Sequence, residues 1–231
     1  MNDFDADGPS ENEWEEQGEL TWNEFDWEKY LREQDNAISR YQNFYEKLQG
    51  HPERIDETAR LMGWEEGDWS AETESEIEAM EESAEGEAAS DYEGLEPYTL
   101  HKNPVFIATK AIYLGLGRQW LEIAGDPLKV AQPLALTFQT ALHRGEDQAS
   151  LAIQALDLGD YAMSVSLFKR ALRELNTSLA LLDASQSGTH PAVTAFRERT
   201  LPKLFDLREI WLRVINECRD ELARHNIDEE N

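Results

Sequence analysis

The most constraining feature of this 231-residue sequence is the separation of its charge. Residues 1–100 hold 31 of the 48 acidic residues and 6 of the 21 basic ones, a net charge of −25, which leaves −2 on residues 101–231. A segment with a large excess of one charge and little apolar surface does not repay the entropy cost of folding. The pattern therefore predicts that the core is built mainly by the second half, which at about 130 residues is long enough for one domain.

Composition divides the chain into five segments. Residues 1–21 form an acidic tail, and residues 64–97 form a Glu/Ser/Ala tract without a basic residue, so both are predicted to be disordered. Residues 22–63 show helical periodicity instead. A helical domain is predicted at 98–226, and a short tail at 227–231.

The segment 22–63 has the spacing of two amphipathic helices. The first carries apolar or aromatic side chains at intervals of three, four and seven, which places them on one stripe: Trp27, Leu31, Ile38, Tyr41, Tyr45 and Leu48. The second is a short helix in "PERIDETARLM" with Ile55, Ala59 and Met62 on one face. Two interpretations remain open for this segment. It either docks on the chain's own helical domain or serves as a recognition segment for a partner.

The second half predicts an all-α fold. Turn sequences such as "GDP", "RGED" and "SQSGT" separate stretches with helical periodicity. Pro133 is expected to kink its helix, and Pro202 to mark a kink or a restart. The predicted helices are 104–124, 127–143, 148–158, 161–184 and 191–224.

The stretch "LAIQALDLGDYAMSVSLFKRALRELN" resembles one tetratricopeptide repeat, in which a Gly-Asp-Tyr turn joins two antiparallel helices. The matching positions are Leu151, Ala152, Gly159, Asp160, Tyr161, Phe168, Ala171 and Leu172. Gly125 precedes Gly159 by 34 residues, which is the period of such repeats. The resemblance covers about residues 103–176 and implies a short array of helical hairpins. An up-down bundle of about five helices is the alternative.

Metal and cofactor chemistry are not indicated. None of the five histidines has a glutamate three residues before it, as di-iron bundles require, and a single cysteine gives no zinc spacing. Cys218 lies on an apolar helical face and is expected to be buried. "GLGR" at 115–118 lies within an apolar helix, so its glycines are expected to permit close helix packing rather than to bind phosphate.

One short motif suggests catalysis. "RDELARH", from Arg219 to His225, resembles the Arg-polar-x4-His signature of HEPN ribonucleases. The resemblance implies RNA cleavage in which His225 acts as acid or base and Arg219 stabilises phosphate charge. The competing interpretation is a solvated helix end, where Arg224 and His225 meet the negative end of the helix dipole.

Tryptophan is concentrated in the acidic half, which is unusual for a disordered tail. Five of the seven tryptophans lie there, and tryptophan is enriched at binding hot spots. The sequence therefore predicts a non-enzymatic interaction or adaptor protein with an acidic-aromatic arm and a groove in its helical domain. The predicted contact residues are Trp14, Trp22, Phe25, Trp27, Tyr30 and Leu31.

The net charge also limits the classes of molecule that are expected to bind. Binding to nucleic acid or anionic lipid depends on Lys and Arg displacing counterions, so a chain of net charge −27 favours a protein partner with a basic or grooved surface. An arm that mimics nucleic acid and inhibits a basic protein is the alternative. No signal sequence and no apolar stretch of about 18 residues is found, so we expect a cytoplasmic protein without a membrane span.

Overall fold

The computed structural model describes residues 22–64, 100–184 and 190–229, with side chains in the last range described up to Arg224. These residues form helices and no strand, which confirms the predicted all-α fold. The helices are α1 (Glu24–Lys47), α2 (Arg54–Met62), the 3-10 helix η4 (Leu100–Lys102), α4 (Pro104–Ala124), α5 (Gln132–Asp157), α6 (Tyr161–Ala184) and α7 (Pro191–Glu229). The predicted disorder of residues 1–21 and of nearly all of 64–97 lies outside the described residues.

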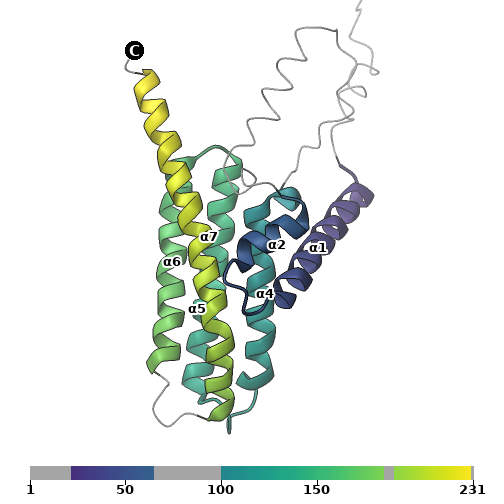
Figure 1. Ribbon diagram of the computed structural model, residues 1–231, viewed down its shortest axis with the longest axis vertical. Coiled ribbons are helices and arrows are strands. Elements are labelled where there is room, and N and C mark those ends of the chain that lie inside the picture. Colours follow the sequence, from purple (N-terminus) through teal and green to yellow (C-terminus); the bar gives the residue numbers. More distant parts are fainter. Residues whose placement is uncertain (1–21, 65–99, 185–189, 230–231) are drawn as a thin grey trace, which may run out of the picture.

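Helices α4, α5, α6 and α7 form an up-down bundle (Figure 1). Each helix packs against the next along the chain, and α7 returns to pack against α4. An aromatic cluster joins three of them, because the Trp120 ring lies 4.5 Å from the Phe138 ring and 4.9 Å from the Phe196 ring between centroids. These three side chains, from α4, α5 and α7, are fully buried.

Helix α4 begins and ends where the sequence predicts. Asn103 caps its first turn, since the Oδ1 atom accepts a hydrogen bond of 3.0 Å from the backbone N–H of Phe106. Pro104 occupies the first helical position, where a missing N–H costs nothing. Buried side chains surround most of the helix, which makes α4 the central element of the bundle.

The C-terminal half of α1, together with α2, packs on the bundle. Ile38, Tyr41 and Tyr45 of α1 are buried in the same core as the apolar side chains of α4, and Ile55 and Ala59 of α2 join them. The structure therefore answers the question left open by the sequence for this part of α1: it docks on the chain's own domain.

Gly115 of α4 permits close approach of α1. A Cβ atom at this position would lie 3.2 Å from Gln42 Nε2 of α1. The same test at Gly117 finds no atom within 4 Å. The prediction that the glycines of "GLGR" permit close helix packing is thus confirmed for Gly115 and wrong for Gly117.

Helix α5 differs from the prediction. It runs without interruption through residues 144–147, where a break was expected, and it begins at Gln132 with Pro133 in its first turn rather than at a kink. The 34 residues from Gly125 therefore contain most of one long helix instead of a hairpin, and the second tetratricopeptide-like unit is not formed. The up-down bundle is the arrangement observed.

Helix α7 also exceeds its predicted length. It continues through Pro202 without a restart and ends at Glu229, five residues beyond the predicted end at residue 224. Most of the predicted tail at 227–231 thus belongs to the helix. None of the described helices is long and apolar enough to cross a membrane.

Candidate functional site

The start of α1 is fixed by two local devices. Asn23 Oδ1 accepts hydrogen bonds from the N–H groups of Phe25 and Asp26, and Asp26 Oδ2 accepts one of 3.0 Å from the N–H of Asn23. This reciprocal pair is a capping box. Trp22 precedes the cap and packs on Trp27 in the first turn, with 5.0 Å between ring centroids, which is the arrangement of a hydrophobic staple.

An aromatic cluster follows from this start. The Tyr30 ring lies 5.6 Å from the Trp22 ring and 5.8 Å from the Trp27 ring, and all three pairs meet edge to face. Trp27 is 38% exposed, and Leu31, one turn further along, is 48% exposed. We call Trp22, Trp27, Tyr30 and Leu31 the α1 outer surface. This end of α1 points away from the bundle (Figure 1).

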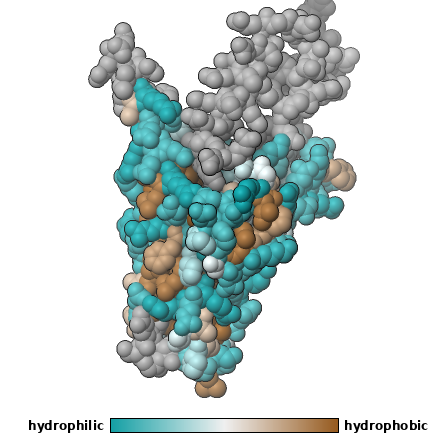
Figure 2. All heavy atoms as spheres, viewed as in Figure 1, coloured by the Kyte–Doolittle hydropathy of each residue, from teal (hydrophilic) through white to brown (hydrophobic). Residues whose placement is uncertain are grey.

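The structure brings together some of the predicted contact residues but not all. Trp22, Trp27 and Tyr30 touch, whereas Phe25 lies about 200° around the helix from Trp27 and is 75% exposed. Trp14 lies outside the described residues. On the largely hydrophilic face in Figure 2, an apolar patch at the outer end of α1 is separate from those over the bundle.

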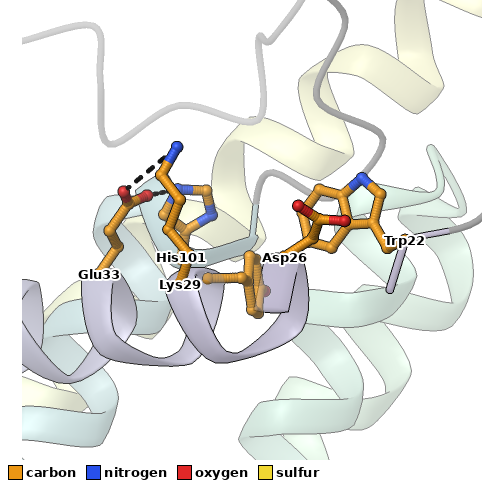
Figure 3. A pocket seen from close by; sticks show the side chains of 6 residues that line it. Trp22, Asp26, Lys29, Glu33 and His101 are labelled. Atoms are coloured by element: carbon orange, nitrogen blue, oxygen red, sulfur yellow. Dashed lines mark ion pairs between the residues drawn. The ribbon is translucent and has the colours of Figure 1, made fainter. Parts of the chain in front are cut away.

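A pocket opens where the first three turns of α1 meet η4. Its volume is about 180 Å³. Figure 3 shows Lys29, Glu33 and His101 converging on one side and Asp26 beside Trp22 on the other. We call this the α1–η4 pocket, and it is lined by Trp22, Asp26, Lys29, Tyr30, Glu33 and His101.

The polar groups of the α1–η4 pocket lie further apart than the atoms of a short hydrogen bond. Glu33 Oε2 lies 3.7 Å from His101 Nε2, and Glu33 Oε1 lies 3.9 Å from Lys29 Nζ. The buried His101 ring meets the Tyr30 ring edge-on at 4.7 Å between centroids. Burial raises the pKa of the Tyr30 phenol above its ordinary value, so the ring is neutral at physiological pH.

A second surface lies between α4 and α5. This α4–α5 groove has a volume of about 250 Å³. The side chains of Leu114 and Leu121, two turns apart on α4, are 44% and 65% exposed. Arg118 and His143 add exposed polar groups. The sequence predicted a groove in the helical domain without indicating these residues.

A network of charged and polar side chains joins α1 and α2 to α7. Lys203 of α7 is only 2% exposed and forms an ion pair with Glu46 of α1. One helical turn later, Asp206 accepts hydrogen bonds from Tyr45 Oη at 2.5 Å and from Arg54 Nε at 2.7 Å. We call these five residues the α7 clamp. Opposite charges are paired within it, so we interpret it as a structural element.

The electrostatics of the α7 clamp agree with that interpretation. Burial is the main cause that raises the pKa of the Tyr45 phenol, and the adjacent Asp206 carboxylate raises it further. Tyr45 therefore stays protonated and donates to Asp206. The ring of Tyr45 also lies under the Arg54 guanidinium, 4.5 Å from its centroid.

The two residues of the ribonuclease-like motif are not seen in a common site. Arg219 is exposed on α7, while the side chain of His225 lies outside the described residues. Arg224 pairs with Glu221 at 2.5 Å, and α7 continues past both. Among the described residues, no group of three or more His, Cys, Asp or Glu side chains is arranged to hold a metal ion.

Comparison of the chain with models of protein families, with curated proteins and with solved structures gave no match. A functional proposal therefore depends on the surfaces described above.

Proposed function

We propose that this protein is a non-enzymatic adaptor that binds a basic protein partner through the α1 outer surface. The observation that carries the proposal is the exposure of Trp27 and Leu31 on a helix that buries one face, at Ile38, Tyr41 and Tyr45, in the core further along. Large aromatic side chains supply most of the binding energy at protein interfaces. The stripe that buries α1 against the bundle continues onto this surface, so an apolar face extends beyond the domain.

Preorganisation supports the same conclusion. The capping box and the contact of Trp22 with Trp27 hold the cluster in one arrangement before a partner arrives. Binding then loses less side-chain entropy than it would with a mobile tail. The strongly acidic first half of the chain adds long-range attraction for a basic partner, which speeds association and disfavours acidic competitors.

The α4–α5 groove supplies a second contact surface, which an adaptor requires. Exposed leucines at 114 and 121 repeat every two helical turns, a spacing that suits the apolar face of a partner helix. The groove belongs to a different helix pair from the α1 outer surface. Two partners can therefore be engaged separately.

Site-specific photo-crosslinking in the native cell tests the proposal. A photoreactive residue is placed at Leu31 on the α1 outer surface, at Leu121 in the groove, and at Leu151 on α5 as the control. Leu151 is 46% exposed, close to the 48% of Leu31, so accessibility is matched. We expect discrete crosslinked proteins from positions 31 and 121 and none from 151. The same products from all three positions would contradict the adaptor function.

A further inference from the structure

We propose that the α1–η4 pocket binds the guanidinium group of an arginine side chain. The inference rests on the proposed function, because it gives the chemistry of one residue of the basic partner. Three features of the pocket carry it: aromatic rings, carboxylates, and a resident lysine that a ligand can displace.

The aromatic walls suit a planar cation. Trp22 and Tyr30 line the pocket, and Trp27 packs against both of them from outside it. Guanidinium groups stack on such rings. A volume of about 180 Å³ is more than ten times the roughly 10–15 Å³ that one water molecule needs by the same measure, so a small planar group has room.

Glu33 is placed to accept the cation. Its present contacts, at 3.7 Å to His101 and 3.9 Å to Lys29, are longer than the 2.7–2.9 Å of a good charge-assisted hydrogen bond. A guanidinium can make two such short bonds to one carboxylate. Asp26 adds a second negative charge at the other end of the pocket.

The dipole of α1 sets which end of the pocket the cation occupies. The positive N-terminal end repels a cation, but this effect is confined to about the first turn, where Asp26 offsets it. Glu33 lies about 10 Å further along the axis. The guanidinium is therefore held beside Glu33 and Tyr30 rather than at the helix start.

Lys29 makes the binding a displacement. Its side chain is 72% exposed and contributes one positive charge against the two carboxylates. A compact ammonium at 3.9 Å forms a weaker contact with Glu33 than a two-point guanidinium. An incoming arginine thus replaces a cation that is easily moved into solvent.

Three blocked tripeptides that differ only in the central residue, arginine, lysine or neutral citrulline, test the proposal on the full chain. Binding is followed by NMR through the Trp22 indole and Tyr30 ring signals at low ionic strength. We expect the arginine peptide to shift these signals, the lysine peptide to bind at least about threefold more weakly, and the citrulline peptide to have no effect.

Charge-matched variants locate the site. Glu33→Gln is expected to weaken binding of the arginine peptide about fivefold, while Asp35→Asn, two residues away and outside the pocket, leaves it unchanged. Lys29→Gln is expected to tighten binding, while Lys47→Gln at the far end of α1 does not. Because Glu33 is exposed, its replacement is expected to leave the fold intact, and the thermal unfolding of each variant checks this.

Equal responses to arginine and citrulline, or equal effects of Glu33→Gln and Asp35→Asn, would overturn the proposed site. Stronger binding of lysine would overturn the choice of a guanidinium. These outcomes are separate from a failure of the adaptor function, because crosslinking at Leu31 does not depend on the pocket. A chain that crosslinks but ignores the arginine peptide keeps the function and loses this inference.

Discussion

Gly145 and Gly117 lie within neighbouring helices but have different surroundings. A Cβ atom at Gly145 of α5 would meet the Tyr113 hydroxyl oxygen at 2.5 Å, whereas one at Gly117 of α4 would meet no atom within 4 Å. Tyr113 is itself buried, and burial raises the pKa of its phenol, so the hydroxyl stays protonated. Gly145 is therefore a packing requirement, and Gly117 only lowers helix propensity.

Alanine at these two positions should change stability in opposite directions. Gly145→Ala is expected to lower the free energy of unfolding by about 1–3 kcal/mol through overpacking, and Gly117→Ala to raise it by up to about 1 kcal/mol. Urea unfolding measures both. Gly145→Ala combined with Tyr113→Phe removes the clashing oxygen and should recover part of the loss. Stabilisation by Gly145→Ala alone would contradict the packing described.

The burial of Cys218 should make its thiol unreactive in the native protein. The residue is fully buried, as the sequence predicted, and burial raises the pKa of its thiol to about 11. We expect thiol reagents at pH 8 to label the native protein only as fast as it unfolds, and the denatured protein at once. Rapid labelling of the native state would show that the thiol is accessible.

The same pKa shift has a defined sign for stability. The folded pKa lies above the unfolded value of about 8.5, so the native state holds the proton more tightly. The contribution to stability is present below about pH 8.5 and is lost as the pH rises towards about 11. Stability should therefore fall across this alkaline range.

Among the contacts between helices, the α7 clamp fixes α1 and α2 to α7. Lys203 is nearly inaccessible to water, while its partner Glu46 is 35% exposed at the side chain. Removing the carboxylate leaves a buried ammonium without its counter-charge, which is far more costly than losing a surface ion pair.

Glu46→Gln is thus expected to lower the free energy of unfolding by about 3 kcal/mol. Glu28→Gln is the matched control, because Glu28 pairs with Arg32 on the exposed side of the same helix, and its loss should cost no more than about 0.5 kcal/mol. Chemical denaturation compares the two. Adding Lys203→Met to Glu46→Gln should restore most of the stability, and failure of both expectations would remove the clamp's assigned role.

Elements that begin or end with a strong local signal were predictable from the sequence. The start of α4 follows from Asn103 and Pro104, and the end of α2 and the start of α6 follow from glycine turns, whereas α2 begins at Arg54 and not at Pro52. The continuity of α5 was not predictable, because the glycine of "RGED" is explained by a contact with Tyr113 from another helix. Likewise, the concentration of aromatic residues in the acidic half indicated Trp22, Trp27 and Tyr30. Glu33 and His101, by contrast, meet only after distant segments pack together.

In the molecule as a whole, α1 and α2 are not a detachable arm. The sequence predicts a helical domain at 98–226 whose core is built mainly by the second half of the chain. In the structure, Ile38, Tyr41 and Tyr45 cover α4, and α1 and α2 supply the partners of Lys203 and Asp206. Truncation would expose apolar surface and leave buried charges unpaired.

A chain of residues 98–231 should therefore lose cooperative unfolding, or at least about 3–5 kcal/mol of stability. A chain of residues 22–231 retains every contact described here and should unfold like the full-length protein. Thermal and urea unfolding followed by circular dichroism distinguish these outcomes. A cooperative transition of unchanged midpoint for residues 98–231 would show that α1 and α2 are dispensable.

Helix α1 is a single helix of 24 residues, packed in the domain at one end and exposed on the surface at the other. Binding of a partner at the exposed end should consequently raise the melting temperature of the entire protein, because a partner that binds only the folded state shifts the equilibrium away from the unfolded state. A substitution that loosens the packed end of α1 should in turn weaken partner binding in cells, although no residue of the α1 outer surface is altered.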